Sequence, residues 1–350
     1  MEAFVEDCRR SLGDRGVALL EPLRNSAILV TGGSGFVGTW LGTLIACLND
    51  WHNFGIELIL TARSKARYAA NAPHLLPRKD IRFVVSDIRQ LFAVPAETRW
   101  IVHAAANPDN RQHSSNPLET MTVIGEGTNR VLRAAEQCVD LRLILHLSSA
   151  LIYGTQPPDR DALTEDYVGH VDSSSAMSAY AEAKRYSEVL CASARSQMRL
   201  PIAIARPFTF LGPFQSVDAP WALNNFIHAA IHGQPLKILG DGSTKRTYLY
   251  GSDAAYLLLC ILAGGKSGDV YNVGHGEAIA LGDLARLVVG EVGQPLEVRF
   301  NTARGAVSAA HLIPDMARAE RAFGFKPATP LRLAIKRTME WNRTEHSATI

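Results

Sequence analysis

A glycine-rich turn between a short apolar run and a helical pattern constrains this chain more than any other feature. Residues 27–38 read Ala-Ile-Leu-Val-Thr-Gly-Gly-Ser-Gly-Phe-Val-Gly. The first four residues predict a buried strand, and the apolar periodicity of residues 39–48 predicts a helix. Gly32 allows the tight turn, Gly35 lets the backbone approach a pyrophosphate, and Gly38 lets the helix lie close to the sheet. Because the first amides of that helix point at an anion, the stretch predicts a dinucleotide-binding site.

Strand-like and helix-like patterns alternate after this turn. Apolar runs predict further strands at 57–61, 81–85, 100–106, 142–147 and 201–206, with helices at 117–137 and around Tyr180. Such alternation predicts an α/β fold with a doubly wound parallel sheet. Beyond Arg206, prolines and glycines interrupt the rhythm, so we expect the C-terminal part to form a second, smaller domain.

The composition limits the kinds of partner and the cellular compartment that we expect for this protein. The chain has 350 residues with 36 Lys and Arg against 34 Asp and Glu, so no basic surplus favours nucleic acid. The five cysteines are scattered and predict reduced thiols of a cytoplasmic protein, neither a disulfide framework nor a metal site. The first ten residues lack the apolar core of a signal peptide, and the longest apolar run, 254–263, is too short to cross a bilayer. We therefore expect no membrane partner.

The residues after the second strand bear on the choice of cofactor. In a dinucleotide fold an acid at this strand end binds the ribose hydroxyls, whereas an arginine accommodates a 2′-phosphate. Here Arg63, Ser64 and Lys65 follow the strand and no acid stands at its tip. The cofactor is thus NADP or NAD, with NADP favoured by Arg63; the alternative interpretation is a solvated basic loop.

The strand at 100–106 ends in His103-Ala-Ala-Ala. Its small residues suit the close approach of a flat cofactor, because ligands bind outside the carboxyl ends of such strands. We interpret His103 as a buried histidine that is satisfied by hydrogen bonds and not as a catalytic group.

Tyr180 and Lys184 stand four residues apart and share one helix face. A tyrosine with a pKa of about 10 is a poor acid or base at neutral pH, and a nearby lysine ammonium is expected to lower that pKa. A serine from 148–149 can hydrogen-bond the same substrate oxygen. Beside a nicotinamide, such a set moves a proton at an alcohol or ketone while hydride moves at its carbon.

Several motifs, taken in order, resemble the extended short-chain dehydrogenase/reductases, and within them the nucleotide-sugar epimerase/dehydratase branch. They are Thr-Gly-Gly-Ser-Gly-Phe-Val-Gly at 31–38, Asp87-Ile88, His103-Ala-Ala, Ser-Ser-Ala-Leu-Ile-Tyr-Gly at 148–154, Tyr180 with Lys184, Arg206-Pro207, Gly240-Asp-Gly with Arg246 and Asp253, and Tyr-Asn-Val-Gly at 271–274. The resemblance covers about residues 26–342. It implies a Rossmann domain, a smaller C-terminal α/β substrate-binding domain, and a homodimer formed through the helices at 117–137 and 177–195.

The domain boundaries implied by this resemblance are 1–24 for a helical extension, 25–206 with 247–274 for the NAD(P)-binding domain, 207–246 with 275–343 for the substrate domain, and 344–350 for a tail. The implied catalytic residues are Ser149, Tyr180 and Lys184, the last also holding the nicotinamide ribose. The implied cofactor-binding residues are Gly32, Gly35, Phe36, Val37 and Gly38 at the pyrophosphate, Arg63 and Ser64 at the 2′-phosphate, Asp87 and Ile88 at the adenine, and Ala104, Ala105 and Pro207 near the nicotinamide. The implied substrate-binding residues are Thr209, Arg246 and Arg304.

Four functions remain open from the sequence. The first is an epimerase acting on a nucleoside-diphosphate sugar by transient hydride transfer at a ring carbon; the second is an NADPH-dependent reductase of a 4-keto sugar or another carbonyl. A 4,6-dehydratase is disfavoured, because the dehydratases resembled here carry Thr-Asp-Glu and decarboxylating relatives keep the Glu, where this chain has Ser149-Ala150-Leu151. An acid from another loop, such as Asp109, Glu165 or Asp166, is the open alternative. The fourth is a dinucleotide sensor without catalysis.

Overall fold

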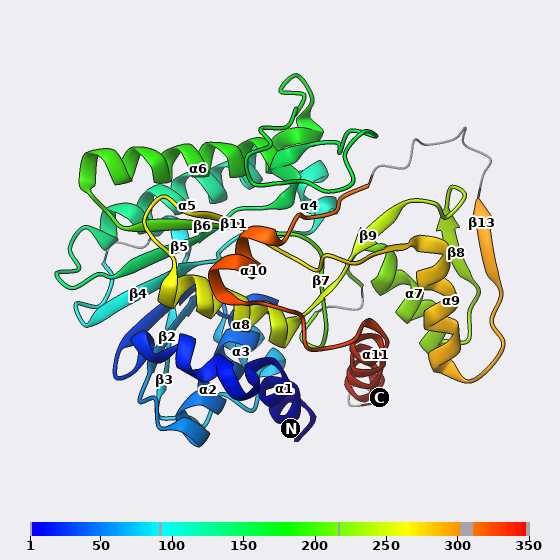
Figure 1. Cartoon of the computed structure of the whole chain (residues 1–350), viewed down its shortest axis with the longest axis horizontal. Coiled ribbons are helices and arrows are strands. Elements are labelled where there is room, and N and C mark those ends of the chain that lie inside the picture. Colours follow the sequence, from blue (N-terminus) through cyan, green and yellow to red (C-terminus); the bar gives the residue numbers. More distant parts are fainter. Residues whose placement is uncertain (1, 91–92, 216–217, 302–310, 348–350) are drawn as a thin grey trace.

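A seven-stranded parallel sheet with the order β11-β6-β5-β4-β1-β2-β3 forms the centre of the molecule (Figure 1). The computed structural model describes residues 2–90, 93–215, 218–301 and 311–347. The strands of this sheet are β1 (Ala27–Thr31), β2 (Glu57–Ala62), β3 (Ile81–Val85), β4 (Thr98–His103), β5 (Leu143–Leu147), β6 (Ile202–Pro207) and β11 (Val270–Val273). The predicted α/β fold with a doubly wound parallel sheet is confirmed. The strand order reverses between β1 and β4, which is where ligands bind in such sheets.

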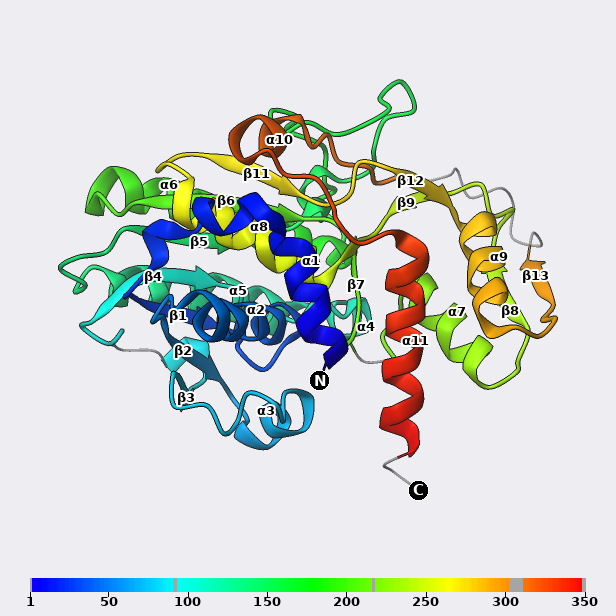
Figure 2. The same ribbon diagram turned by 60° about the horizontal axis from the view of Figure 1, so that its bottom comes forward.

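Helices cover both faces of the sheet (Figures 1 and 2). One face carries α5 (Pro117–Ala135) and α6 (Ala179–Met198), which pack on each other; the other carries α1 (Glu2–Leu19), α2 (Phe36–His52) and α8 (Gly251–Gly264). Short elements in the connections are η1 (Glu21–Leu23), α3 (Lys65–Asn71), η2 (Ile88–Gln90), α4 (Asn110–Ser115), η3 (Ala150–Tyr153) and η4 (Ala176–Ser178). Because both faces are covered, β1 and β5 are buried along their whole length.

The C-terminal part builds a smaller α/β unit beside the carboxyl ends of the large sheet. Its elements are β7 (Phe210–Leu211), α7 (Ala222–Ile231), β8 (Leu236–Leu239), β9 (Lys245–Thr247), β10 (Leu249–Tyr250), β12 (Ala278–Ala280), α9 (Leu281–Val292), β13 (Val298–Asn301) and α11 (Leu331–Ser347). The short helix α10 (Ala317–Phe323) packs instead on β11 and α8. The strands pair as β7 with β10, β8 with β13 and β9 with β12. Between these pieces the chain returns to the large sheet, because α8 packs on α2 and β11 pairs with β6. We propose the sequence-derived domain boundaries on this basis.

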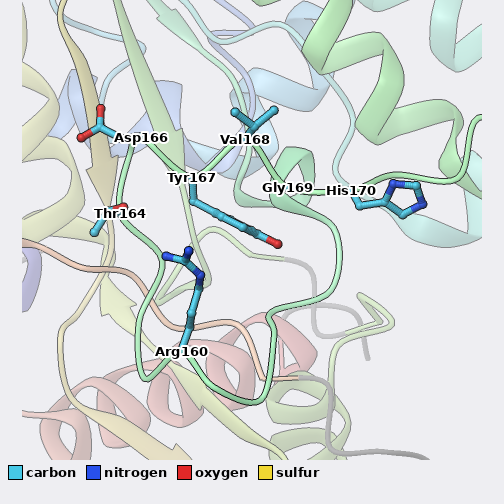
Figure 3. A pocket seen from close by; sticks show the side chains of 7 residues that line it. All are labelled: Arg160, Thr164, Asp166, Tyr167, Val168, Gly169 and His170. Atoms are coloured by element: carbon cyan, nitrogen blue, oxygen red, sulfur yellow. The ribbon is translucent and has the colours of Figure 1, made fainter.

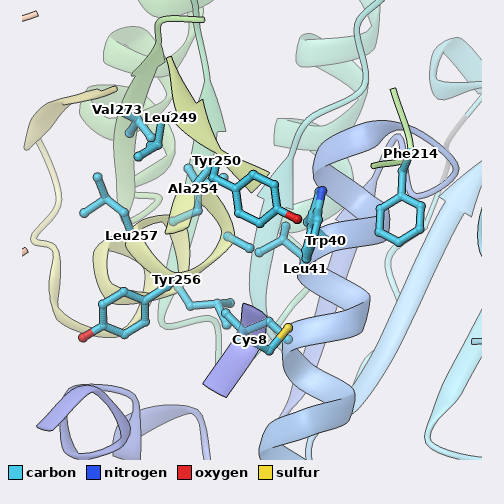
Figure 4. Packing of buried hydrophobic residues seen from close by; sticks show 14 of the residues in the cluster. Cys8, Trp40, Leu41, Phe214, Leu249, Tyr250, Ala254, Tyr256, Leu257 and Val273 are labelled. Atoms are coloured by element: carbon cyan, nitrogen blue, oxygen red, sulfur yellow. The ribbon is translucent and has the colours of Figure 1, made fainter. Parts of the chain in front are cut away.

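The first helix belongs to the core. Cys8 of α1 lies among Trp40 of α2 and residues of α8, as Figure 4 shows. Tyr250 donates a hydrogen bond of 2.7 Å to Asp7, whose carboxylate is fully buried. Trp40 donates through Nε1 to the carbonyl of Pro213 at 3.1 Å. The contacts of Cys8 and Asp7 tie α1 to α2, α8 and β10, and that of Trp40 ties α2 to the loop after β7.

Candidate active site

The glycine turn after β1 has the geometry that a pyrophosphate requires. Gly32 has a φ of 74°, and a Cβ there would lie 2.9 Å from the carbonyl oxygen of Ala104. A Cβ on Gly38 would lie 2.5 Å from the Cα of Gly33, so any side chain would push α2 away from the turn. The helix begins at Phe36, three residues before the predicted start at 39. The amides of its first turn, including Val37, have no acceptor within the helix, so the turn fits a dinucleotide.

A chain of hydrogen bonds joins this turn to the end of β4. The Thr31 hydroxyl accepts hydrogen bonds from the amides of Ala104 at 3.1 Å and Ala105 at 3.2 Å, and lies 2.8 Å from Nδ1 of His103. Because both lone pairs of the hydroxyl are used, its hydrogen is donated to Nδ1, which is therefore unprotonated. Nε2 of His103 then donates to Thr128 at 3.2 Å, and Thr128 donates to Ile124. The prediction of a buried, satisfied histidine is confirmed.

The three predicted catalytic residues lie together beyond β5. Ser149 caps η3 by accepting from the amide of Leu151 at 3.2 Å, which leaves its hydroxyl hydrogen for another acceptor. Tyr180 and Lys184 stand on adjacent turns of α6, with Nζ of Lys184 5.9 Å from the centre of the tyrosine ring. Nζ also donates to the carbonyl of Leu147 at 2.7 Å, which anchors the lysine to the end of β5.

The electrostatics of this group differ from the expectation. Burial raises the pKa of Tyr180 to about 12, while a hydrogen bond with Ser149 acts in the opposite direction. Burial also lowers the pKa of Lys184 to about 8. The predicted lowering of the tyrosine pKa by the lysine is therefore wrong for this state of the protein, because desolvation is the largest contribution and the contribution that opposes it comes from the hydrogen bond with Ser149.

His113 is a residue of this site that the sequence did not reveal. It lies on α4, the short helix between β4 and α5, and its ring stacks on that of Tyr180 with 4.1 Å between centroids and 12° between planes. A lone histidine in a polar loop carries no motif that would have marked it.

The predicted adenine end is organised by an ion pair. Arg89 donates to both carboxylate oxygens of Asp87, and these bonds lower the pKa of Asp87 to about 2. Ile88 packs against α5, where a Cβ on Gly127 would lie 2.8 Å from its side chain. Arg63 is exposed directly after β2, and Ser64 caps α3 by accepting from an amide of that helix. Their roles at a cofactor stay predictions.

Thr209 and Arg246, two of the predicted substrate residues, lie in the part of the chain that follows β6. Pro207, predicted to lie near the nicotinamide, ends β6, and the carbonyl of Thr209 accepts from the amide of Leu249 at 3.0 Å. Arg246 is half-buried on β9, and burial lowers the pKa of its guanidinium. Arg304 lies outside the described residues. Their contacts with a substrate stay predictions.

A cavity of about 580 Å³ lies within the segment that connects η3 to η4. Its lining residues are Arg160, Thr164, Asp166, Tyr167, Val168, Gly169 and His170. Figure 3 shows the side chain of Arg160 against the ring of Tyr167, with 4.8 Å between the guanidinium carbon and the ring centre. This lining includes none of the residues to which we assign a role at the cofactor or in catalysis.

A parallel sheet in this order, with a glycine turn after β1 and a Tyr-Lys pair on the helix after β5, defines the dinucleotide-binding α/β class of enzymes. The sequence profile of the NAD-dependent epimerase/dehydratase family matches residues 28–274. The chain belongs to this family, and the prediction of an enzyme of this class is confirmed.

Characterised relatives and solved structures agree with that assignment. The chain is 27% identical to UDP-glucuronic acid decarboxylase 1 of Xenopus tropicalis over 94% of this chain and 75% of the relative. It is 28% identical to UDP-glucuronic acid decarboxylase 6 of Arabidopsis thaliana over 89% of each chain. An epimerase structure from Methanothermobacter thermautotrophicus superposes with a TM-score of 0.81 at 23% identity, covering 96% of this chain and 97% of the other. The UDP-glucuronic acid 4-epimerase of Bacillus cereus, in complex with UDP-glucuronic acid and NAD, superposes with a TM-score of 0.77 at 22% identity, covering 91% and 99%.

Among the described residues, we find no helix with the length and apolar character that crossing a bilayer demands.

Proposed function

We propose that this enzyme is a 4-epimerase of a nucleoside-diphosphate sugar, with a UDP-hexuronic acid as the first substrate to test. The relatives named above are UDP-glucuronic acid decarboxylases by sequence and include a UDP-glucuronic acid 4-epimerase by structure. Both reactions begin with removal of a proton from a ring hydroxyl and of hydride from its carbon. Decarboxylation and epimerisation differ at the next step, so the residues around the reacting carbon determine which of the two reactions takes place.

The observation that carries the proposal is that no carboxylic acid stands at the two positions after Ser149. Where the resemblance places a glutamate in decarboxylating and dehydrating relatives, this chain has Leu151, whose side chain is 45% exposed. Ala150 precedes it and is buried in η3. Neither side chain donates or accepts a proton, and loss of a positioned acid or base costs about 10²–10⁴-fold in rate. An epimerase needs no such group, because the keto sugar only receives hydride again.

The acids from other loops are already engaged. Asp109 caps α4 and pairs with Arg111, which lowers the pKa of Asp109 and keeps it ionised. Glu165 accepts from the amide of Asn272 at 2.9 Å. Asp166 pairs with Arg318 at 2.9 Å. A general acid needs a proton at neutral pH, so these contacts argue against a substitute for the missing glutamate.

In this proposal the phenolate form of Tyr180, whose own proton has passed to solvent, accepts the proton of the sugar hydroxyl as hydride leaves its carbon, and returns it when hydride comes back. The nicotinamide supplies the hydride acceptor when it is bound. Ser149, which hydrogen-bonds with Tyr180 in this structure, donates its hydroxyl hydrogen to the reacting oxygen when the substrate is bound. Lys184, held by the carbonyl of Leu147, places a positive charge beside the phenol ring. This charge stabilises the phenolate that accepts the substrate proton.

Product analysis after incubation with UDP-glucuronic acid and NAD tests this proposal. We expect a product of unchanged mass that differs in configuration at C4, and no solvent deuterium at C4 when the reaction runs in D₂O, because the hydride returns to the same carbon. Loss of CO₂ would indicate a decarboxylase, loss of water a dehydratase, and a gain of two hydrogens from a 4-keto sugar with NADPH a reductase. Each of these three products would overturn the epimerase. A thermal-shift screen of UDP-, dTDP-, CDP- and GDP-sugars identifies the nucleotide, since ligands raise the melting temperature by linkage.

We also propose that the enzyme accepts NADP. Arg63 stands exposed after β2, and no acid occupies the tip of that strand. Asp87, whose pKa is lowered in part by the charge of Arg63, is held by Arg89. A guanidinium in this place binds a 2′-phosphate through charge-assisted hydrogen bonds.

The predicted homodimer through α5 and α6 is likewise a proposal. These helices expose apolar side chains, with Leu118 80%, Tyr186 54% and Val189 61% exposed. A cavity of about 300 Å³ lies between the two helices and is partly lined by Met121. Sedimentation of the wild type and of Leu118→Asp tests the interface, and a wild type that sediments as a monomer refutes it.

The five free cysteines support a cytoplasmic location.

A further inference from the structure

His113 lies face to face with the residue that we propose as the acid/base. The two rings are 12° from parallel with 4.1 Å between their centroids, and both side chains are buried, with 5% of His113 and 8% of Tyr180 exposed. Tyr180 is otherwise packed by Ile124 and Ala183. A phenol on a helix can rotate about its side-chain bonds, so a flat ring on its face restricts where the hydroxyl points.

The histidine is itself held by its own segment. Nε2 lies 2.6 Å from the carbonyl oxygen of Asn107, and because a carbonyl only accepts, Nε2 carries the hydrogen. The side chain of Asn107 donates to Gln112 at 2.9 Å, and Asp109 caps the helix that carries the ring. This segment starts where β4 ends, so the stack connects the nicotinamide side of the sheet to the helix that bears Tyr180.

The protonation state of His113 suits this position. Burial lowers its pKa, and the positive charge of Lys184 acts in the same direction, while Asp109 and the bond to Asn107 act against them. A neutral imidazole adds no second positive charge beside Lys184. The ring thus contributes shape and a defined orientation to the site.

We propose that His113 is a positioning residue of the reaction, which sets the direction of the Tyr180 hydroxyl through ring stacking. The inference rests on the proposed role of Tyr180. Because a displacement of about 1 Å in a reacting group costs on the order of 10²-fold in rate, removal of the stack lowers kcat about 10- to 100-fold. The Michaelis constant and the cofactor affinity change little, because His113 contacts the tyrosine and not the glycine turn.

The test measures kcat and KM with UDP-glucuronic acid, NAD affinity and the melting temperature for His113→Ala and His113→Phe. The alanine variant loses kcat, and the phenylalanine variant, which keeps a flat ring, recovers it to within a few-fold. His113→Leu fills the volume without a flat ring and replaces the alanine variant if that does not fold. Ser114→Ala, on the exposed side of the same short helix, is the matched control and keeps wild-type kcat.

The outcomes separate this inference from the proposed function. An unchanged kcat in His113→Ala overturns it, and so does a loss of kcat that comes with weaker NAD binding and is not recovered by phenylalanine. These two outcomes for the His113 variants are interpreted only if the wild type is active and the Tyr180→Phe variant is inactive. If Tyr180→Phe keeps wild-type activity, or the wild type does not turn over any nucleotide sugar, the proposed function fails instead.

Discussion

Acid should destabilise this enzyme through His103, the buried histidine below the cofactor turn. Burial, with a contribution from the charge of Lys184, lowers the pKa of His103 to about 3. In the unfolded chain its pKa is about 6.5. Between these two values the unfolded chain binds one more proton than the folded protein does. The free energy of unfolding therefore falls as the pH falls from about 6.5 towards 3, and is unaffected by this residue above that window.

The size of the effect follows from the same shift. Each pH unit inside the window removes about 1.4 kcal/mol, so His103 alone accounts for a loss of about 2 kcal/mol at pH 5. Protonation of Nδ1 would remove the acceptor for the hydroxyl hydrogen of Thr31. The oxygen of the same hydroxyl accepts from the amides of Ala104 and Ala105. Because the folded protein keeps His103 neutral down to about pH 3, we expect this residue to leave NAD affinity unchanged within the window.

Urea unfolding of the wild type and of His103→Asn at about pH 7.5 and pH 5 measures this contribution. The variant is less stable at neutral pH, because it loses the contact to Thr128, but its stability falls by about 2 kcal/mol less than that of the wild type between the two pH values. His146 is also buried, and burial lowers its pKa, but it is present in both proteins. His170→Asn, at an exposed histidine, is the matched control. Equal losses in the wild type and in His103→Asn would refute the reasoning.

Three further predictions concern the site. Tyr180→Phe should lower kcat about 10²–10⁴-fold with NAD affinity nearly unchanged, and wild-type turnover in a sample free of contaminating enzyme would refute the acid/base role. Arg63→Ala should weaken NADP binding while NAD binding stays the same; Arg67→Ala, exposed on α3, is the control, and equal NADP affinity of the Arg63→Ala variant and the wild type would contradict the 2′-phosphate assignment. Gly38→Ala should abolish dinucleotide binding and lower stability by about 1–3 kcal/mol, because its Cβ meets backbone that cannot move aside; calorimetric titration and thermal unfolding check both effects.

The local chemistry of this chain was readable because it depends on neighbours in the sequence. The glycine turn at 31–38, the strands of the parallel sheet and the spacing of Tyr180 and Lys184 all follow from patterns a few residues long. The absence of an acid at 150–151 was equally plain. The apolar period did not locate the start of α2, which begins at Phe36 and not at 39. The amides of a first turn need no partner within the helix, so the residues of that turn do not have to follow the apolar period.

Only the tertiary structure decided the environment of the catalytic group. The sequence places a lysine one helical turn from Tyr180, but the pKa of the tyrosine is raised by burial, which no local pattern reports. The stacking of His113 on Tyr180 joins segments 67 residues apart in the chain (113 to 180). The engagement of Glu165 by Asn272 and of Asp166 by Arg318 is likewise set by long-range packing. Sequence patterns determine which groups a segment offers, whereas desolvation and partners depend on elements that meet only in the folded chain.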